Sequence, residues 1–140
     1  MARKLRVYFN AALAPDRAAL HAAIKGSGIR LTLDDAYAPF DTTGYLPCTL
    51  EGEDAGVDLR FDRDGDWPDT ARALAAERGD RQAVAMLAWG GDPREQISAW
   101  LLAAALAQTA QGLILDAQRG QLVAADALVK QAKALAADSF

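Results

Sequence analysis

The chain contains few of the residues that most often carry catalysis, metal binding or membrane insertion. Its 140 residues include one cysteine, Cys48, and one histidine, His21. Cys48 has no partner for an intramolecular disulfide, which favours a reducing compartment. One histidine is too few for a histidine-rich metal site. The longest apolar run, residues 97–107 interrupted only by Ser98, is well short of the roughly 20 residues that a membrane span needs. We therefore expect a soluble, cytoplasmic protein with no membrane partner.

Catalytic and cofactor motifs are also missing. The segment from Asp62 to Asp66 starts like a calcium loop, but Trp67 and Ala73 stand where the loop needs its glycine and its bidentate glutamate. The turn at residues 89–92 precedes a helix, but it lacks the spacing and the lysine of a phosphate loop. We predict no catalytic residue, no cofactor and no metal ion.

Negative charge is concentrated in one part of the chain. Residues 34–69 contain eleven acidic and two basic side chains, a net charge of −9 in a chain whose total is −4. A concentrated negative field attracts basic partners and repels nucleic acid. We predict that a protein partner binds here and that nucleic acid does not bind directly. The predicted partner-binding residues are Asp41, Glu51, Glu53, Asp54, Asp58, Asp62, Asp64, Asp66 and Trp67.

Trp67 and Asp116 each have two alternative roles. Trp67 is either an aromatic anchor for the partner or a residue that packs at the start of the helix opened by Pro68. Asp116 follows a short apolar strand and is expected to be partly buried near a sheet end. It either pairs with Arg119 or lines a cleft together with the turn at Trp89.

Hydrophobic periodicity predicts an α+β fold in a single globular domain, residues 1–140. The element order is β-α-β-β-β-α-β-α-β-α, which implies a mixed, mainly antiparallel sheet with helices packed on one face. The first strand, from Leu5 to Phe9, is expected at a sheet edge. The strand containing Pro47 is expected at an edge or with a bulge, because proline has no backbone N–H. Asp92 and Glu95 predict a capping box at a helix start. The expected strands are 5–9, 29–34, 45–50, 57–61, 83–89 and 113–116, and the expected helices are about 15–26, 68–79, 93–110 and 124–137.

Three short segments carry a resemblance to a known class of proteins. They are Gly44-Tyr45-Leu46-Pro47, the turn from Gly52 to Val57, and Trp89-Gly90-Gly91-Asp92 before an alanine-rich helix. Over about residues 40–118 the pattern resembles small bacterial proteins, some of which are similar to immunity proteins of type VI and other polymorphic toxin systems. The resemblance implies a cytoplasmic protein that neutralises a basic toxin domain by occluding it.

Two further classes of function are left open. The acidic strip could imitate nucleic-acid phosphates and so occupy a nucleic-acid-binding protein. The cleft near Asp116 could instead serve a small ligand-binding or enzymatic domain. Self-association into a homodimer is a further mode of interaction that the sequence leaves open.

Overall fold

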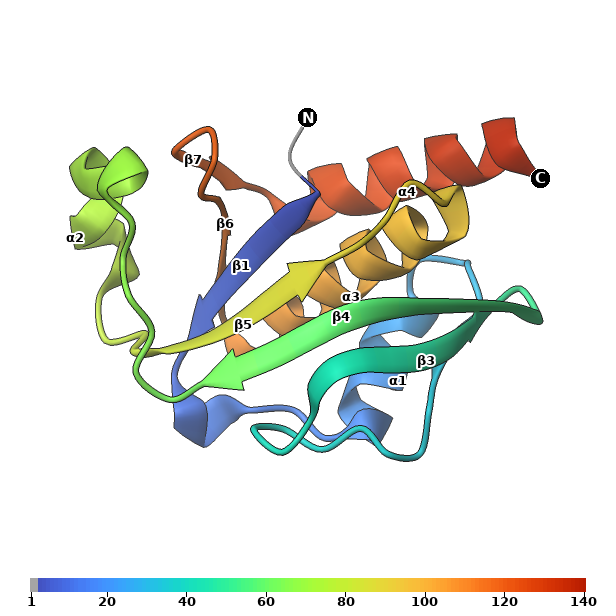
Figure 1. Ribbon diagram of the computed structural model, residues 1–140, viewed down its shortest axis with the longest axis horizontal. Helices are drawn as coiled ribbons and strands as arrows, with labels where there is room; N and C mark the ends of the chain where they lie inside the picture. The colour runs from blue at the N-terminus through green and yellow to red at the C-terminus, as the bar shows by residue number, and fades with distance from the viewer. Residues whose placement is uncertain (1–2) are drawn as a thin grey trace.

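Seven strands form one sheet in the computed structural model, which describes residues 3–140 (Figure 1). Their order across the sheet is β2-β3-β4-β5-β1-β6-β7, and every neighbouring pair is antiparallel. The strands are β1 (Lys4–Phe9), β2 (Leu31–Leu33), β3 (Thr43–Leu50), β4 (Glu53–Asp62), β5 (Ala83–Ala88), β6 (Leu113–Asp116) and β7 (Gln121–Val123).

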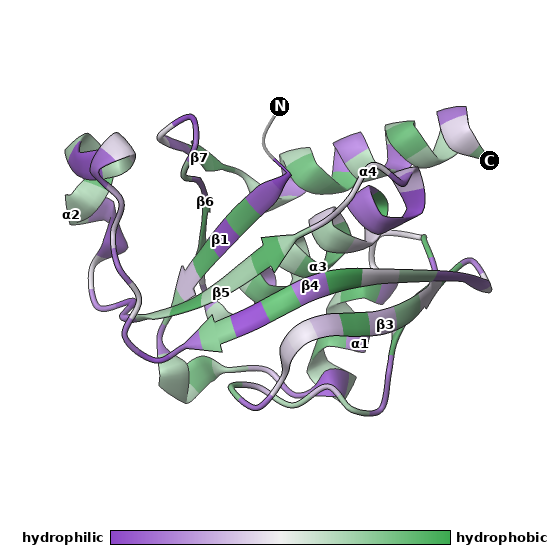
Figure 2. Ribbon diagram, in the orientation of Figure 1, coloured by the Kyte–Doolittle hydropathy of each residue, from purple (hydrophilic) through white to green (hydrophobic). Residues whose placement is uncertain are grey.

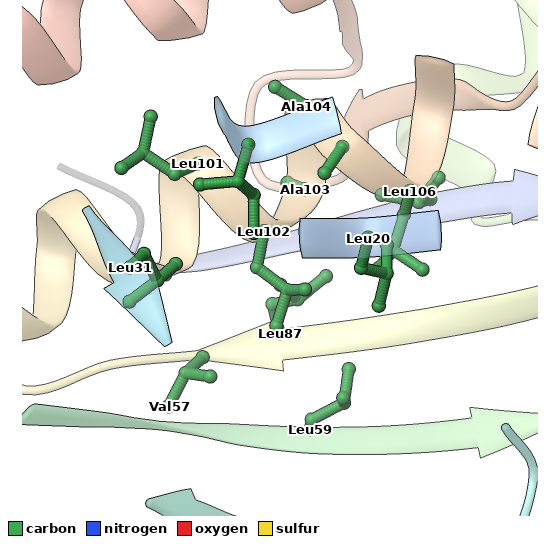
Figure 3. Close-up of a cluster of buried hydrophobic side chains, with 14 of the residues drawn as sticks. Leu20, Leu31, Val57, Leu59, Leu87, Leu101, Leu102, Ala103, Ala104 and Leu106 are labelled. Carbon is green, nitrogen blue, oxygen red and sulfur yellow. The ribbon is translucent and has the colours of Figure 1, made fainter. Parts of the chain in front are cut away.

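Three helices cover one face of this sheet. The central one, α3, packs against β1, β3, β4, β5 and β6, and α1 and α4 pack against α3. In Figure 3 the side chain of Leu102 on α3 points toward Leu87 on β5, with Val57 and Leu59 of β4 beside it. The helical elements are η1 (Ala11–Leu13), α1 (Arg17–Lys25), η2 (Asp69–Leu74), α2 (Ala75–Arg78), α3 (Pro93–Ala110) and α4 (Ala125–Ser139).

The centre of the sheet is buried on both faces. On β1 the alternate residues Val7 and Phe9 belong to the main core under the helices, whereas Tyr8 points to the other face. There Tyr8 packs with Trp67 and Ala71 from the segment that follows β4. Figure 2 shows the alternation of polar and apolar residues along β1 and β4.

The segment from β4 to β5 is fixed on this second face by a hydrogen bond from β1 and by hydrogen bonds within the segment itself. The amide of Gly65 donates to the carbonyl of Gln82 at 2.9 Å, and the Tyr8 hydroxyl donates to the carbonyl of Asp66. The Arg78 guanidinium donates to the Gly65 carbonyl and lies 5.0 Å from the Tyr8 ring centroid. The loop after β4 is therefore a folded part of the molecule.

Backbone groups of the edge strand β2 are partly covered by side chains of α1. The Leu33 amide donates to Nε2 of His21 at 2.9 Å, and Nε of Arg17 donates to the Leu33 carbonyl at 2.9 Å. The other edge strand, β7, has three residues, as β2 does. Short or covered edges limit pairing with a second chain.

The predicted α+β class is confirmed, as an antiparallel sheet with helices packed on it. The helix expected over residues 68–79 is the short unit η2–α2, and it packs on the opposite face of the sheet from the other helices. Strand β7 was not expected. The first strand is central rather than at an edge, because β5 and β6 pair with its two sides.

Two local expectations were also wrong. Pro47 lies in β3, which is the second strand and not an edge, but β2 pairs only with residues 48–50 and so leaves the side facing Pro47 free of a strand. Glu95 does not bond back to Asp92, because its carboxylate accepts the amide of Gly90 at 3.2 Å. Asp92 itself caps α3 by accepting the Arg94 amide at 2.9 Å. Among residues 3–140 no helix combines the length and the apolar character that a membrane crossing requires.

Replacing Gly65 with alanine is expected to destabilise the fold. A methyl group at Gly65 would overlap with the side chain of Val84 on β5, and forced overpacking of this kind costs about 1–3 kcal/mol. Urea unfolding followed by circular dichroism measures the loss. Gly26→Ala is the matched control, because its methyl group would meet only the Ala23 carbonyl oxygen at 3.4 Å. If both variants unfolded at the same urea concentration, the close packing of Gly65 against Val84 would be contradicted.

Stability is expected to fall between pH 7.5 and pH 5.5 through His21. Burial, with a smaller contribution from the Arg17 charge, lowers the pKa of His21 below its usual 6.5, and its Nε2 must be unprotonated to accept the Leu33 amide. The unfolded chain therefore takes up the proton first, so the stabilisation is complete above pH 6.5 and declines below it. Thermal unfolding at both pH values measures this loss. His21→Gln, which cannot titrate, should show a smaller drop, and an equal drop would rule His21 out.

Candidate functional site

The predicted partner-binding residues lie in two groups at opposite ends of the molecule. Glu51, Glu53 and Asp54 lie at the hairpin that joins β3 and β4, whereas Asp62, Asp64 and Asp66 lie at the end of β4 and in the loop after it. Strand β4 runs from Glu53 to Asp62, so the two groups lie roughly 30 Å apart at about 3.3 Å per residue. Figure 1 shows the hairpin tip and the loop end at opposite ends of the long axis. The acidic stretch is thus not one continuous patch.

At the hairpin end, acidic side chains gather around a cavity of about 290 Å³. Asp34 and Asp35 follow β2, and Asp54 lies across the hairpin opposite Thr49. Arg17 is the one basic side chain in the lining and lies 3.2 Å from Asp35. The complete lining is Arg17, Thr32, Leu33, Asp34, Asp35, Pro47, Cys48, Thr49 and Asp54. Three carboxylates against one guanidinium leave this cavity with an excess of negative charge.

An exposed aromatic residue lies beside this cavity. Tyr45 is 61% exposed, and its ring covers Gly56 while its hydroxyl donates to the Ala55 carbonyl at 3.1 Å. Alternation along β3 places Tyr45 on the same face as Pro47, which lines the cavity. Partial desolvation of the hydroxyl, followed by the charge of Glu95, raises the pKa of Tyr45. We call Asp34, Asp35, Tyr45, Glu53 and Asp54 the hairpin-end surface.

Sequence reasoning did not select Asp34, Asp35 or Tyr45 for the binding site. The first two lie in the acidic stretch, but only the pairing of β2 with β3 brings them to Asp54. The alternation of Tyr45 with the buried residues Leu46 and Cys48 is a signal that could have placed it on the outer face.

Other predicted site residues are engaged within the fold. Glu51 accepts the Arg30 amide at 2.9 Å, and this hydrogen bond lowers the pKa of Glu51. Asp58, on the second face of β4, lies 3.1 Å from Nε of Arg60. Asp41 is exposed in the loop before β3.

The aromatic residue at the loop end, Trp67, is half-buried, whereas Tyr45 at the hairpin end is exposed. We call Asp62, Asp64 and Asp66 the loop-end surface. Trp67 is half-buried beside it: its ring centroid lies 4.8 Å from that of Tyr8, and Nε1 donates to the Ala71 carbonyl at 2.7 Å. These contacts match packing at a helix start, the alternative role considered for Trp67.

A second cavity, of about 400 Å³, lies where β6, β7 and α4 meet the end of β5. Both Asp116 and Trp89 line it, so the structure brings together the two residues expected near a cleft. Trp100, expected in the core, is half-buried and also lines it. Oδ1 of Asp116 accepts the Arg119 amide at 3.1 Å, and Oδ2 lies 3.9 Å from Nε of Arg119.

Within residues 3–140 no three metal-binding side chains lie close enough together to hold an ion. The acids of the segment 62–66 bond locally instead, as Oδ1 of Asp62 accepts the Asp64 amide at 3.0 Å. Comparison of the chain with protein-family models, with curated proteins and with solved structures finds no match. The geometry of the two cavities is thus the basis for any functional argument.

The Cys48 thiol is expected to react slowly in the folded protein. Cys48 is buried, and this burial raises the pKa of its thiol, which lowers the fraction of reactive thiolate. Labelling with a chromogenic disulfide reagent at pH 8 should be at least about 100-fold slower in buffer than in denaturant. Free glutathione under both conditions corrects for the effect of denaturant on the reagent. Comparable rates for Cys48 would show that the thiol is accessible.

Proposed function

We propose that the chain is a non-enzymatic protein-binding module whose hairpin-end surface docks a basic protein domain. The observation that carries the proposal is the excess of carboxylates around the hairpin-end cavity. Asp34, Asp35 and Asp54 face a single guanidinium, that of Arg17. A lysine or arginine side chain of the partner would enter this cavity and balance its charge.

Tyr45 supplies the aromatic contact of the proposed interface. Exposed tyrosine beside charged residues is a common arrangement in protein-binding sites, where the ring is buried on association and the charges steer the partner. The ring of Tyr45 is held against Gly56, so little side-chain freedom would be lost on binding.

The biological role that fits such a module is neutralisation of a bacterial toxin in the cytoplasm. The resemblance of residues 40–118 to immunity proteins of polymorphic toxin systems supports this role. The protein would occlude a basic toxin domain stoichiometrically, with no reaction of its own. The predicted contribution of Asp62, Asp64 and Asp66 to the same interface becomes a question for experiment, since they lie at the other end of β4.

Neutralising the hairpin-end surface is expected to slow association. In the triple variant Asp34→Asn, Asp35→Asn, Asp54→Asn, the association rate with the partner should fall about tenfold at low salt, because the steering charge is lost. The difference should shrink as salt is added. Affinity capture on the full chain identifies the basic domain, and stopped-flow fluorescence then measures the rate.

The loop-end triple variant Asp62→Asn, Asp64→Asn, Asp66→Asn is the matched control, because it removes the same charge at the other end of β4. It should associate at nearly the normal rate. Equal slowing by both triples would contradict a localised hairpin-end interface, and no slowing by either would exclude acidic steering. Competition by duplex DNA for the captured partner would indicate nucleic-acid mimicry.

A further inference from the structure

The cavity at Trp89 and Asp116 has the size and lining of a small-molecule site. Its volume of about 400 Å³ falls within the range of roughly 300–1,000 Å³ that is usual for ligand pockets. Indole rings of Trp89 and Trp100 and the side chains of Leu5 and Leu128 provide apolar wall. Polar groups come from Asp116, Arg119, Gln121 and Gln131. A lining that combines apolar and polar groups in similar measure can hold a ligand in one orientation.

Trp89 contributes an unpaired polar group to this region. Its side chain is 9% exposed, and Nε1 is the one buried side-chain nitrogen or oxygen within residues 3–140 that has no hydrogen-bond partner. Buried N–H groups are rarely left without an acceptor. Nε1 is closed off in the unliganded protein, but the indole borders the cavity. Donation from Nε1 to a ligand requires the ring to turn toward that space.

Asp116 offers the complementary acceptor. Its side chain is 15% exposed, and Oδ1 already accepts the Arg119 amide. Oδ2 lies 3.9 Å from the guanidinium of Arg119, beyond hydrogen-bond distance, so it can still accept an N–H group. Arg119 is 62% exposed and belongs to the rim. The two ionised groups of the lining cancel, which favours a ligand without net charge.

We propose that this cavity binds a neutral, planar nitrogen heterocycle of the nucleobase class. Ring and exocyclic N–H groups of the base would donate to Asp116, and a ring nitrogen or carbonyl oxygen would accept from Trp89. The faces of the base would contact the indole rings, because aromatic side chains bind all bases through their π faces. This site is separate from the hairpin-end surface and does not depend on the proposed protein partner.

Guanosine is the most informative probe, because its base has two adjacent N–H donors for one carboxylate. Titration of the full chain with guanosine should change the tryptophan emission through Trp89 and Trp100, and calorimetry should give the same dissociation constant. Guanosine 5′-monophosphate should bind no more tightly than guanosine, since the site carries no net positive charge. Tighter binding of the monophosphate would replace this assignment with an anion site at Arg119.

Asp116→Asn tests the carboxylate without removing the acceptor for the Arg119 amide. It should weaken guanosine binding at least about tenfold, whereas Asp126→Asn on α4, outside this cavity, should leave binding unchanged. Gln131→Trp fills the cavity from an exposed helix position and should abolish binding even if the Asp116 variant folds poorly. No emission or heat change up to 1 mM with any of the four common nucleosides would overturn the proposal. The proposal would also be overturned if Asp116→Asn and Gln131→Trp bound guanosine as tightly as the control Asp126→Asn.

Discussion

The burial of α3 against the sheet is the contact on which the rest of the structure depends. Eleven of its 18 residues are buried, more than a one-sided amphipathic helix can hide, because the sheet covers one side and α1 and α4 cover others. Alanines at positions such as 103, 104 and 105 let these elements approach closely. The one buried polar side chain of α3, Ser98, donates its hydroxyl to the Arg94 carbonyl at 2.7 Å.

The two candidate sites differ in their relation to α3, because no residue of α3 lines the hairpin-end cavity, whereas Trp100 of α3 lines the cavity at Trp89 and Asp116. The hairpin-end surface extends past the helix layer on β2, β3 and β4, and the cavity at Trp89 and Asp116 lies where α4 and β7 complete the other side of the sheet. The first site has excess negative charge and is open to a macromolecule. The second has balanced charge and indole walls. The two sites could therefore act on different classes of ligand without sharing a residue.

Local pattern was sufficient for most of the fold. The continuous apolar run of β5 and the Asp92–Pro93 start of α3 each reported a local property, and both elements formed where they were expected. The alternation of β4 was recognised over residues 57–61, but the strand begins at Glu53, within the expected turn. The order in which the strands pair could not be predicted from local sequence pattern. Strand β1 was expected at an edge because of its positive charge, but Lys4 and Arg6 alternate with the core residues Leu5, Val7 and Phe9 and so belong to the face of the sheet that α3 does not cover.

The residues of the two sites were predictable only in part, because local pattern does not show which distant segments come together. Asp116 and Trp89 were expected to lie near one another, and they line one cavity, but the contribution of Trp100 depends on how α3 is rotated. The acidic stretch was visible as a sum of charges. Its division into two ends follows from the length of β4, and the grouping of Asp34 with Asp54 follows from the order β2-β3-β4. A count of charges along the sequence does not show which acidic residues lie together in the fold.

The central position of β1 has a consequence for the order of events during synthesis. This strand pairs only with residues 83–88 and 113–115, so β1 leaves the ribosome long before either of its partner strands has been made. Long-range pairing of this kind makes folding slow compared with that of helical proteins. During this interval, Lys4 and Arg6 interrupt the apolar residues of β1, as charged gatekeepers do in segments that could otherwise aggregate. Their charge thus has a role before the sheet exists.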